Sequence, residues 1–498
     1  MNENIRIFEF RQEITLLNDM KKAFLLLVLA IFGTTWAGAK ITLPTFFSDN
    51  MVLQQNTEAA IWGWTDQAGN ISITTTWTGV KVTVTPDRDG KWMAHVKTPA
   101  AGGPYKVFIS EGSKGERITL ENVMIGEVWF CSGQSNMEMP VKGYGGQPAE
   151  GAADFIMKAK AKTPIRICNI TRKASLTPLQ ECEGSWQENT PEAVGPTSAT
   201  AYFFASKLQE VLDIPVGIIV SCWGGSTIET WINRETLASQ FAKEFDLSFL
   251  DGTELKSPQF QTPCTLFNGQ VAPLVPFTFG GMIWYQGEAN RGRAEQYIRL
   301  QKAYVEMMRN IFEVPDAPFY FVQIAPYPYD DPDGWTSGYF TEAQGKSVNV
   351  IPNSGMAATL DIGEFGTIHP CKKQEVGNRL AYLALVKHYG IKGIDPDAPA
   401  YESVEFEDGK AIVKFKVADR SLSPAGVDVE GFEIAGADKV FHPAVGHVQN
   451  WGDKVIVSSP DVPDPVAVRY CFRNWGVGTL FNNYGIPVAP FRTDNWNL

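Results

Sequence analysis

Apolar segments of strand length alternate with segments of helix length in the middle of the chain, and this alternation leaves few possible folds. The apolar segments are 128–131, 215–220, 281–285 and 319–324, and the helix-length segments are 198–211, 294–312 and 374–388. A strand that is apolar along its whole length is buried on both faces, which is typical of a parallel sheet covered by helices on either side. We therefore predict an α/β region.

The flanking segments alternate with a period of two residues, which indicates half-buried strands. Short strand-like segments separated by turn residues fill the region before the α/β part, and alternation returns at 411–417 and 454–458. A chain of 498 residues is long enough for two or three packed units. We predict a β-sandwich domain at 40–122, an α/β domain at 123–393 and a second β domain at 394–498.

The amino end has the pattern of a cleaved export signal. Lys21 and Lys22 precede an apolar run at 23–32, and small residues at Ala37 and Ala39 follow it. Ten apolar residues fall short of the ~20 that a membrane-spanning helix needs. We predict that translation begins at Met20 after an extension, that cleavage occurs near Ala39, and that the protein is secreted or periplasmic without a stable membrane span.

Charge and cysteine usage exclude several classes of protein. The formal net charge is −12 and the part after the signal has no basic run, so we expect no nucleic-acid partner. The seven cysteines are scattered without a zinc-like spacing, so neither a disulfide framework nor a metal site is indicated. No nucleotide loop or haem motif is present, and we expect no cofactor.

Four segments place polar residues directly after predicted strands, where open α/β sheets bind ligands. Ser135 lies in a Gly-Gln-Ser-Asn-Met turn at 133–137, and Gly224 and Gly225 lie in a second turn at 221–231. Adjacent glycines let backbone N–H groups approach a ligand oxygen. The other two segments are Trp-Tyr-Gln-Gly-Glu at 284–288 and the loop at 361–370, which contains His369.

Taken together, these four segments resemble the sialate O-acetylesterase family, a branch of the SGNH-type serine hydrolases. The resembling motifs are Gly-Gln-Ser-Asn-Met at 133–137, Trp-Gly-Gly-Ser-Thr-Ile-Glu-Thr-Trp at 223–231, Trp-Tyr-Gln-Gly-Glu at 284–288 and Ile-His-Pro at 368–370. The resemblance extends over essentially all of 40–498. It implies an SGNH-hydrolase fold, that is, a flavodoxin-like three-layer α/β/α arrangement with a central parallel sheet.

The resemblance also implies a carboxylic-ester hydrolase with Ser135 as nucleophile and His369 as general base. The oxyanion donors would be the Ser135 N–H, the N–H of Gly224 or Gly225, and the side chain of Gln286.

The acid that orients His369 stays open. SGNH-type enzymes commonly carry Asp three residues before the His, and this chain has Gly366 there. Glu288 is the favoured candidate, Asp361 and Glu364 are alternatives, and a Ser–His dyad with a backbone carbonyl is the fallback.

The expected substrate is an O-acetylated sialic acid on a glycan. Asn136, Arg291 and Arg293 are candidate substrate-binding residues, the arginines because a guanidinium suits the sialate carboxylate. Two alternatives remain at this stage. One is an esterase acting on acetylxylan or another acetylated plant glycan, and the other is a noncatalytic glycan-binding protein with the same fold.

Overall fold

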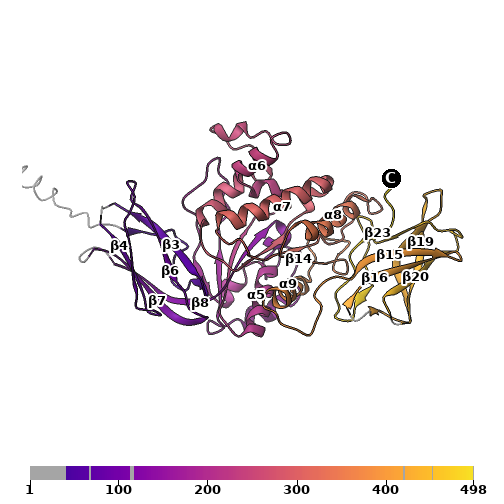
Figure 1. Cartoon of the computed structure of the whole chain (residues 1–498), viewed down its shortest axis with the longest axis horizontal. Helices are drawn as coiled ribbons and strands as arrows, with labels where there is room; N and C mark the ends of the chain where they lie inside the picture. The colour runs from indigo at the N-terminus through magenta and orange to yellow at the C-terminus, as the bar shows by residue number, and fades with distance from the viewer. Residues whose placement is uncertain (1–40, 67–68, 113–116, 419–420, 451, 497–498) are drawn as a thin grey trace, which may run out of the picture.

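The computed structural model describes residues 41–66, 69–112, 117–418, 421–450 and 452–496. The predicted export signal and its cleavage point lie outside these residues. The chain forms a β region, a central α/β region and a second β region in a row (Figure 1). This mixed α/β architecture with flanking β regions confirms the prediction at that level.

The central region is built on six parallel strands, β9, β11, β8, β12, β13 and β14, in that spatial order. Their bounds are β8 Arg117–Gly133, β9 Ile165–Asn169, β11 Val216–Cys222, β12 Gly281–Tyr285, β13 Phe319–Val322 and β14 Ser354–Ala357. The short strand β10 (Trp186–Glu188) pairs antiparallel with β9 at one edge. Numbered along the chain, the order is second, third, first, fourth, fifth, sixth. The flavodoxin order of second, first, third is therefore not the one observed, because β11 lies between β9 and β8.

Helices cover both faces of this sheet (Figure 1). Helices α5 (Ala199–Leu212) and α9 (Lys373–Leu383) pack on the face that carries Trp129 and Cys131. Helices α7 (Ala294–Ile311) and α8 (Thr336–Val350) pack together on the other face, where Val128 and Phe130 of the same strand contribute to the core. Alternate residues of each buried strand thus supply two separate cores, which explains the continuous apolar runs in the sequence.

The amino-terminal β region consists of short, mostly antiparallel strands, three of which form a separate sheet while the others are joined to the central sheet through β8. Its strands are β1 Ile41–Thr42, β2 Val52–Gln54, β3 Glu58–Thr65, β4 Ile71–Thr75, β5 Lys81–Val84, β6 Lys91–Lys97 and β7 Gly102–Glu111. The first half of β8 pairs with β7 and its second half lies in the parallel sheet. The predicted boundary between 122 and 123 falls inside this strand, and the domain limits stay a prediction.

The carboxyl-terminal β region is a seven-stranded antiparallel sheet with a small two-stranded sheet beside it. The strands of the large sheet are β15 Ala400–Glu407, β16 Lys410–Lys416, β18 Asp428–Ala435, β19 Phe441–Gln449, β20 Lys454–Ser458, β21 Ala467–Tyr470 and β23 Phe491–Arg492. Strands β17 (Leu422–Ser423) and β22 (Phe481–Asn482) form the small one.

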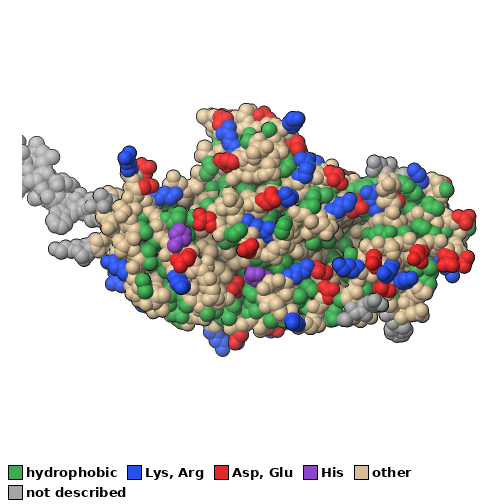
Figure 2. All heavy atoms as spheres, in the orientation of Figure 1, with side chains coloured by type: hydrophobic (Ala, Val, Ile, Leu, Met, Phe, Trp, Pro, Cys, Tyr) green, Lys and Arg blue, Asp and Glu red, His purple; other side chains and the backbone are tan. Residues whose placement is uncertain are grey.

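Positive and negative side chains are interspersed on the face shown in Figure 2, so this face has no large area of a single charge.

Within the described part of the chain, no helix has the length and apolar character needed to cross a membrane. All seven cysteines are free thiols.

Candidate active site

Ser135 is held at the carboxyl end of β8 by a tight turn against β12. Gly133 has φ +144°, and a Cβ there would lie 2.2 Å from the carbonyl oxygen of Tyr285. The Gln134 N–H donates to that same oxygen (2.9 Å), and Gln134 Oε1 accepts from the Gly287 N–H (3.1 Å). Only glycine permits this approach, which places Ser135 as the first residue of the short helix α2 (Ser135–Glu138).

The position between β8 and β12 is the point at which the strand order reverses. The strand after β8 in sequence lies toward one edge of the sheet, and the strand after β12 lies toward the other. In open α/β sheets such a reversal leaves a crevice at the carboxyl ends of the strands, where ligands bind. Ser135 therefore occupies the place that the fold provides for a substrate.

The glycine turn after β11 lies directly against Ser135, as predicted from the strand ends. A Cβ built on Gly224 would be 3.3 Å from the Cβ of Ser135. The Gly224 N–H donates to Glu138 Oε2 (2.8 Å), and Glu138 also pairs with Arg172 (3.3 Å). Gly225 adopts φ +74°, which a residue with a side chain rarely adopts. The first two motifs thus meet at one end of the sheet.

His369 lies in the loop between β14 and α9, and its ring contacts a residue that also contacts Ser135. The ring of Tyr144 packs edge-on against His369 with 5.2 Å between centroids, and the Tyr144 hydroxyl donates to the Ser135 carbonyl oxygen (3.1 Å). His369 Nδ1–H donates to Gln147 Oε1 at 2.7 Å. Because Nδ1 carries the hydrogen of the neutral ring, Nε2 keeps its lone pair and can accept a proton.

The surroundings of His369 favour the neutral imidazole. Burial lowers the pKa of His369 to about 4, and the positive charge of Lys373 acts in the same direction. Desolvation disfavours the charged form of a base, so the ring is uncharged at neutral pH. A neutral imidazole is the form that a general base requires.

Beneath Ser135 and His369 lies a buried polar cluster of Asn136, Glu288 and Lys373, here called the Asn136 cluster. Asn136 Nδ2 donates to Glu288 Oε1 (2.6 Å) and to the carbonyl oxygen of Ile368 (3.0 Å). Lys373 Nζ donates to Asn136 Oδ1 (2.6 Å). One side chain therefore joins the turn that carries Ser135 to the loop that carries His369.

Burial shifts the pKa values of the two ionisable groups in the Asn136 cluster. Lys373 has no exposed surface, and burial lowers its pKa to about 7, while the nearby Glu288 opposes this shift. Burial likewise raises the pKa of the Glu288 carboxyl. Asn136 itself is 1% exposed with its amide fully engaged, so its contacts are with the protein and not with a substrate.

The three acids predicted as partners of His369 have other contacts. Glu288 is bonded to Asn136, Asp361 forms a bidentate pair with Arg379 (2.6 and 2.8 Å), and Glu364 Oε1 accepts from the Cys371 N–H (2.5 Å). The residue hydrogen-bonded to His369 Nδ1 is Gln147. The sequence gives little sign of this, because Gln147 lies in a glycine-rich loop outside the four motifs.

The predicted oxyanion donor Gln286 is fully buried and its amide hydrogens are occupied. Gln286 Nε2 donates to the Ser226 carbonyl oxygen (3.0 Å) and to Asn290 Oδ1 (2.7 Å). This leaves the side chain no N–H for a developing oxyanion. Gln286 connects the second and third motifs instead.

The two arginines predicted to bind substrate, Arg291 and Arg293, have different contacts within the protein. Arg293 donates to Glu229 (2.7 Å) and to Gln296 (2.8 Å). Arg291 lies over the ring of Tyr329, with its guanidinium carbon 3.3 Å from the centroid, and it interacts electrostatically with Glu288. Arg291 is thus the one whose neighbours connect it to the Asn136 cluster.

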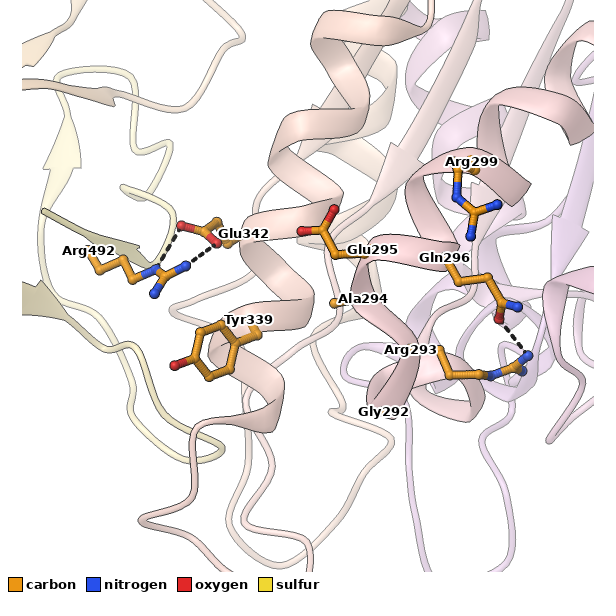
Figure 3. A pocket seen from close by; sticks show the side chains of 9 residues that line it. All are labelled: Gly292, Arg293, Ala294, Glu295, Gln296, Arg299, Tyr339, Glu342 and Arg492. Carbon is orange, nitrogen blue, oxygen red and sulfur yellow. Dashed lines mark hydrogen bonds and ion pairs between the residues drawn. The ribbon is translucent and has the colours of Figure 1, made fainter. Parts of the chain in front are cut away.

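Arg293 also lines a cavity of about 700 Å³ between α7, α8 and β23 (Figure 3). Four of the five charged side chains around it, all except Glu295, form ion pairs within the described part of the chain. Arg492 contacts Glu342 at 3.1 Å with two nitrogens, and Arg299 contacts Glu244 at 2.7 Å. No group of three or more His, Cys, Asp or Glu side chains suited to a metal ion occurs among the residues that the structure describes.

Known proteins that resemble this chain are carbohydrate esterases. A model of the family described as carbohydrate esterase, sialic acid-specific acetylesterase, matches residues 125–385. The mouse sialate O-acetylesterase is 25% identical over 88% of this chain and 91% of its own length, and the human one is 28% identical over 76% and 77%. The crystal structure of a carbohydrate acetylesterase from Xanthomonas citri is 33% identical, with a TM-score of 0.81 over 92% of this chain and all of that chain. The chain therefore belongs to the carbohydrate esterase family of sialic acid-specific acetylesterases and is a carboxylic-ester hydrolase.

Proposed function

We propose that this chain removes O-acetyl groups from sialic acids by a serine mechanism with Ser135 as nucleophile and His369 as general base. The observation that supports the proposal is that the two residues share neighbours. Tyr144 contacts both residues, and Asn136, the neighbour of Ser135, is bonded to the carbonyl of Ile368, the neighbour of His369.

In the first half of the reaction, Ser135 Oγ attacks the acetyl carbonyl carbon while His369 Nε2 takes the hydroxyl proton. The tetrahedral intermediate then collapses, the bond to the sugar oxygen breaks, and that oxygen takes the proton from Nε2. In the second half, water attacks the acetyl-serine, gives its proton to Nε2, and acetate leaves as Ser135 regains the proton. This division of labour is the one used by serine hydrolases on unrelated folds.

The oxyanion in this proposal is held by backbone donors. Ser135 opens α2, so its N–H has no acceptor within the helix. Gly225 lies next to Gly224, which is packed against Ser135, and its N–H is the second donor. Loss of one such donor from an enzyme of this type costs about 2.7–4 kcal/mol of transition-state stabilisation.

The assignment to the SGNH type is part of the same proposal. It is supported by a sheet with helices on both faces, a serine after the first parallel strand, a glycine turn after the third, and a histidine before the last helix. The Asp that SGNH-type enzymes commonly carry three residues before the histidine is replaced here by Gly366. We propose that Gln147 accepts the hydrogen bond from the Nδ1–H of His369 instead. An amide oxygen fixes the tautomer without adding a charge.

Substitutions at Gln147 test this assignment through the pH profile. We expect kcat/KM of the unchanged protein to rise with pH through about 4, the pKa of His369, because only the neutral ring accepts the serine proton. In Gln147→Glu a carboxylate on Nδ1 favours the imidazolium and raises this pKa, so the acid limb moves to higher pH. Gln147→Ala is expected to lower the plateau by about 10-fold or more, since a positioned base is worth ~10²–10⁴-fold.

Three groups surround the titrating ring and enter this interpretation: Gln147, Tyr144 and Lys373. Of these, Lys373 carries the charge that opposes protonation of His369. An acid limb that stays in place in Gln147→Glu would mean that another group is the base.

The substrate is tested by comparing acetyl donors. Sialate O-acetylesterases are the curated relatives, while the relative from Xanthomonas citri is named only as a carbohydrate acetylesterase, which keeps acetylxylan as the alternative. We expect acetate release from O-acetylated sialic acid to exceed that from acetylxylan, with Arg291 near the sialate carboxylate. A serine-directed organophosphate should block both. A preference for acetylxylan would assign the other substrate class, and resistance to the organophosphate would exclude the serine mechanism.

A further inference from the structure

An aromatic side chain lies exposed in the loop that carries His369. Phe365 is 61% exposed, more than any other aromatic residue in the described part of the chain. It lies in a turn closed by a bridge between Glu364 and Thr367. Since four residues of extended chain span at most ~14 Å, Phe365 lies within that distance of His369.

Phe365 packs against a tryptophan from the carboxyl-terminal β region. The ring of Trp475, between β21 and β22, lies 5.3 Å from that of Phe365 at an interplanar angle of 88°. The backbone holds Trp475 in place, because its N–H donates to the Pro332 carbonyl oxygen (3.0 Å) and the neighbouring Asn474 N–H donates to Gly334 (2.6 Å). The two rings therefore sit where the α/β region meets the β region.

A groove of about 450 Å³ continues from Trp475 over the carboxyl-terminal β region. Its lining combines apolar groups with an ion pair between Arg473 and Glu433 at 2.5 Å. Sugars present C–H groups on their faces and hydroxyls at their edges. A surface that offers aromatic rings next to fixed charged groups matches both parts of such a ligand.

We propose that Phe365 and Trp475 form a binding site for the sugar units that extend beyond the acetylated one. The carboxyl-terminal β region would thus take part in choosing the substrate, favouring oligosaccharides over free acetylated sugars. This inference rests on the proposed function, because it places the acetylated unit at Ser135. Figure 1 shows the β region adjoining the α/β region, as the proposal requires.

The test compares Phe365→Ala and Trp475→Ala on three substrates: an O-acetylated sialyl-oligosaccharide, the free O-acetylated sialic acid and a small chromogenic acetyl ester. We expect KM for the oligosaccharide to rise about tenfold in each variant, equivalent to about 1.4 kcal/mol. For the two small substrates, KM and kcat should change less than about twofold, as for other surface substitutions. Phe365→Trp, which keeps an aromatic face, should retain the oligosaccharide KM.

Phe406→Ala is the matched control, since Phe406 is 39% exposed on β15 and belongs to the same β region as Trp475. It should leave all three substrates unaffected. An unchanged oligosaccharide KM in Phe365→Ala would overturn the inference, and so would an equal rise for all three substrates, which would indicate a displaced His369 loop. Ser135→Ala, run in parallel, reports on the proposed function alone. If it retains activity, the mechanism fails, whatever the aromatic variants do.

Discussion

Ser135→Ala is expected to lower kcat for acetate release by at least about 10⁴-fold, because the variant has no oxygen with which to form the acetyl-enzyme. The residual rate would come from substrate binding and the oxyanion donors. Ser135 is only partly buried at the start of α2, and alanine is a good helix former, so the folded structure should persist. Acetate release under saturating substrate, together with the melting temperature, checks both parts.

Ser132→Ala is a matched control from the same motif. Ser132 lies three residues earlier in β8 and is fully buried, so it cannot reach a substrate. Its loss should change kcat less than about threefold. If Ser135→Ala retained more than about 1% of the activity, the nucleophile would be another residue.

The elements that sequence periodicity predicts well are those with strong and uninterrupted patterns. Strands β12 and β20 occupy the predicted residues, and α5 and α7 differ from their predicted bounds by one residue. In α5, the predicted start at Ser198 is the N-cap, whose side chain accepts from the Ala201 N–H.

Several elements were missed, and for β14 and α8 the reason is that their residues carry little local signal. Strand β14 is the short segment Ser354–Ala357, which lacks an apolar run and is a strand because it pairs in parallel with β13. Helix α8 buries the polar residues Thr341, Gln344 and Ser347 on its inner side. Neither a strand pattern nor an apolar stripe is present in such cases, so tertiary contacts decide the structure.

The same distinction applies to the candidate site. The ends of parallel strands are predictable, so the meeting of Ser135 with the Gly224 turn followed from the sequence. The contact of Gln147 with His369 depends on how an irregular loop folds back over the sheet, and no spacing rule predicts it. Lys373 follows His369 by four residues at the start of a helix, where an exposed lysine is the usual interpretation, yet it is fully buried.

The buried charges of the Asn136 cluster need a structural explanation, because burying them is costly unless they are hydrogen-bonded. Asn136 provides the bonds on both sides, accepting from Lys373 and donating to Glu288. Its third bond, to Ile368, reaches the loop of His369. The same amide therefore provides hydrogen-bond partners for both buried charges and connects the turn of Ser135 to the loop of His369.

Asn136→Ala is accordingly expected to affect both stability and catalysis. Lys373 and Glu288 would lose a buried partner, and removal of one member from such a group costs about 3–5 kcal/mol in the free energy of unfolding, measurable by urea denaturation. The Ser135 turn would also lose its bond to the His369 loop, and a misplacement of about 1 Å lowers kcat by about 10²-fold. Asn268→Ala is the control, because Asn268 is equally buried and donates two bonds to the backbone at Ser175 and Leu176 without touching the site. It should lose stability and keep kcat, and a loss of kcat no greater in Asn136→Ala than in this control would contradict the positioning role of Asn136.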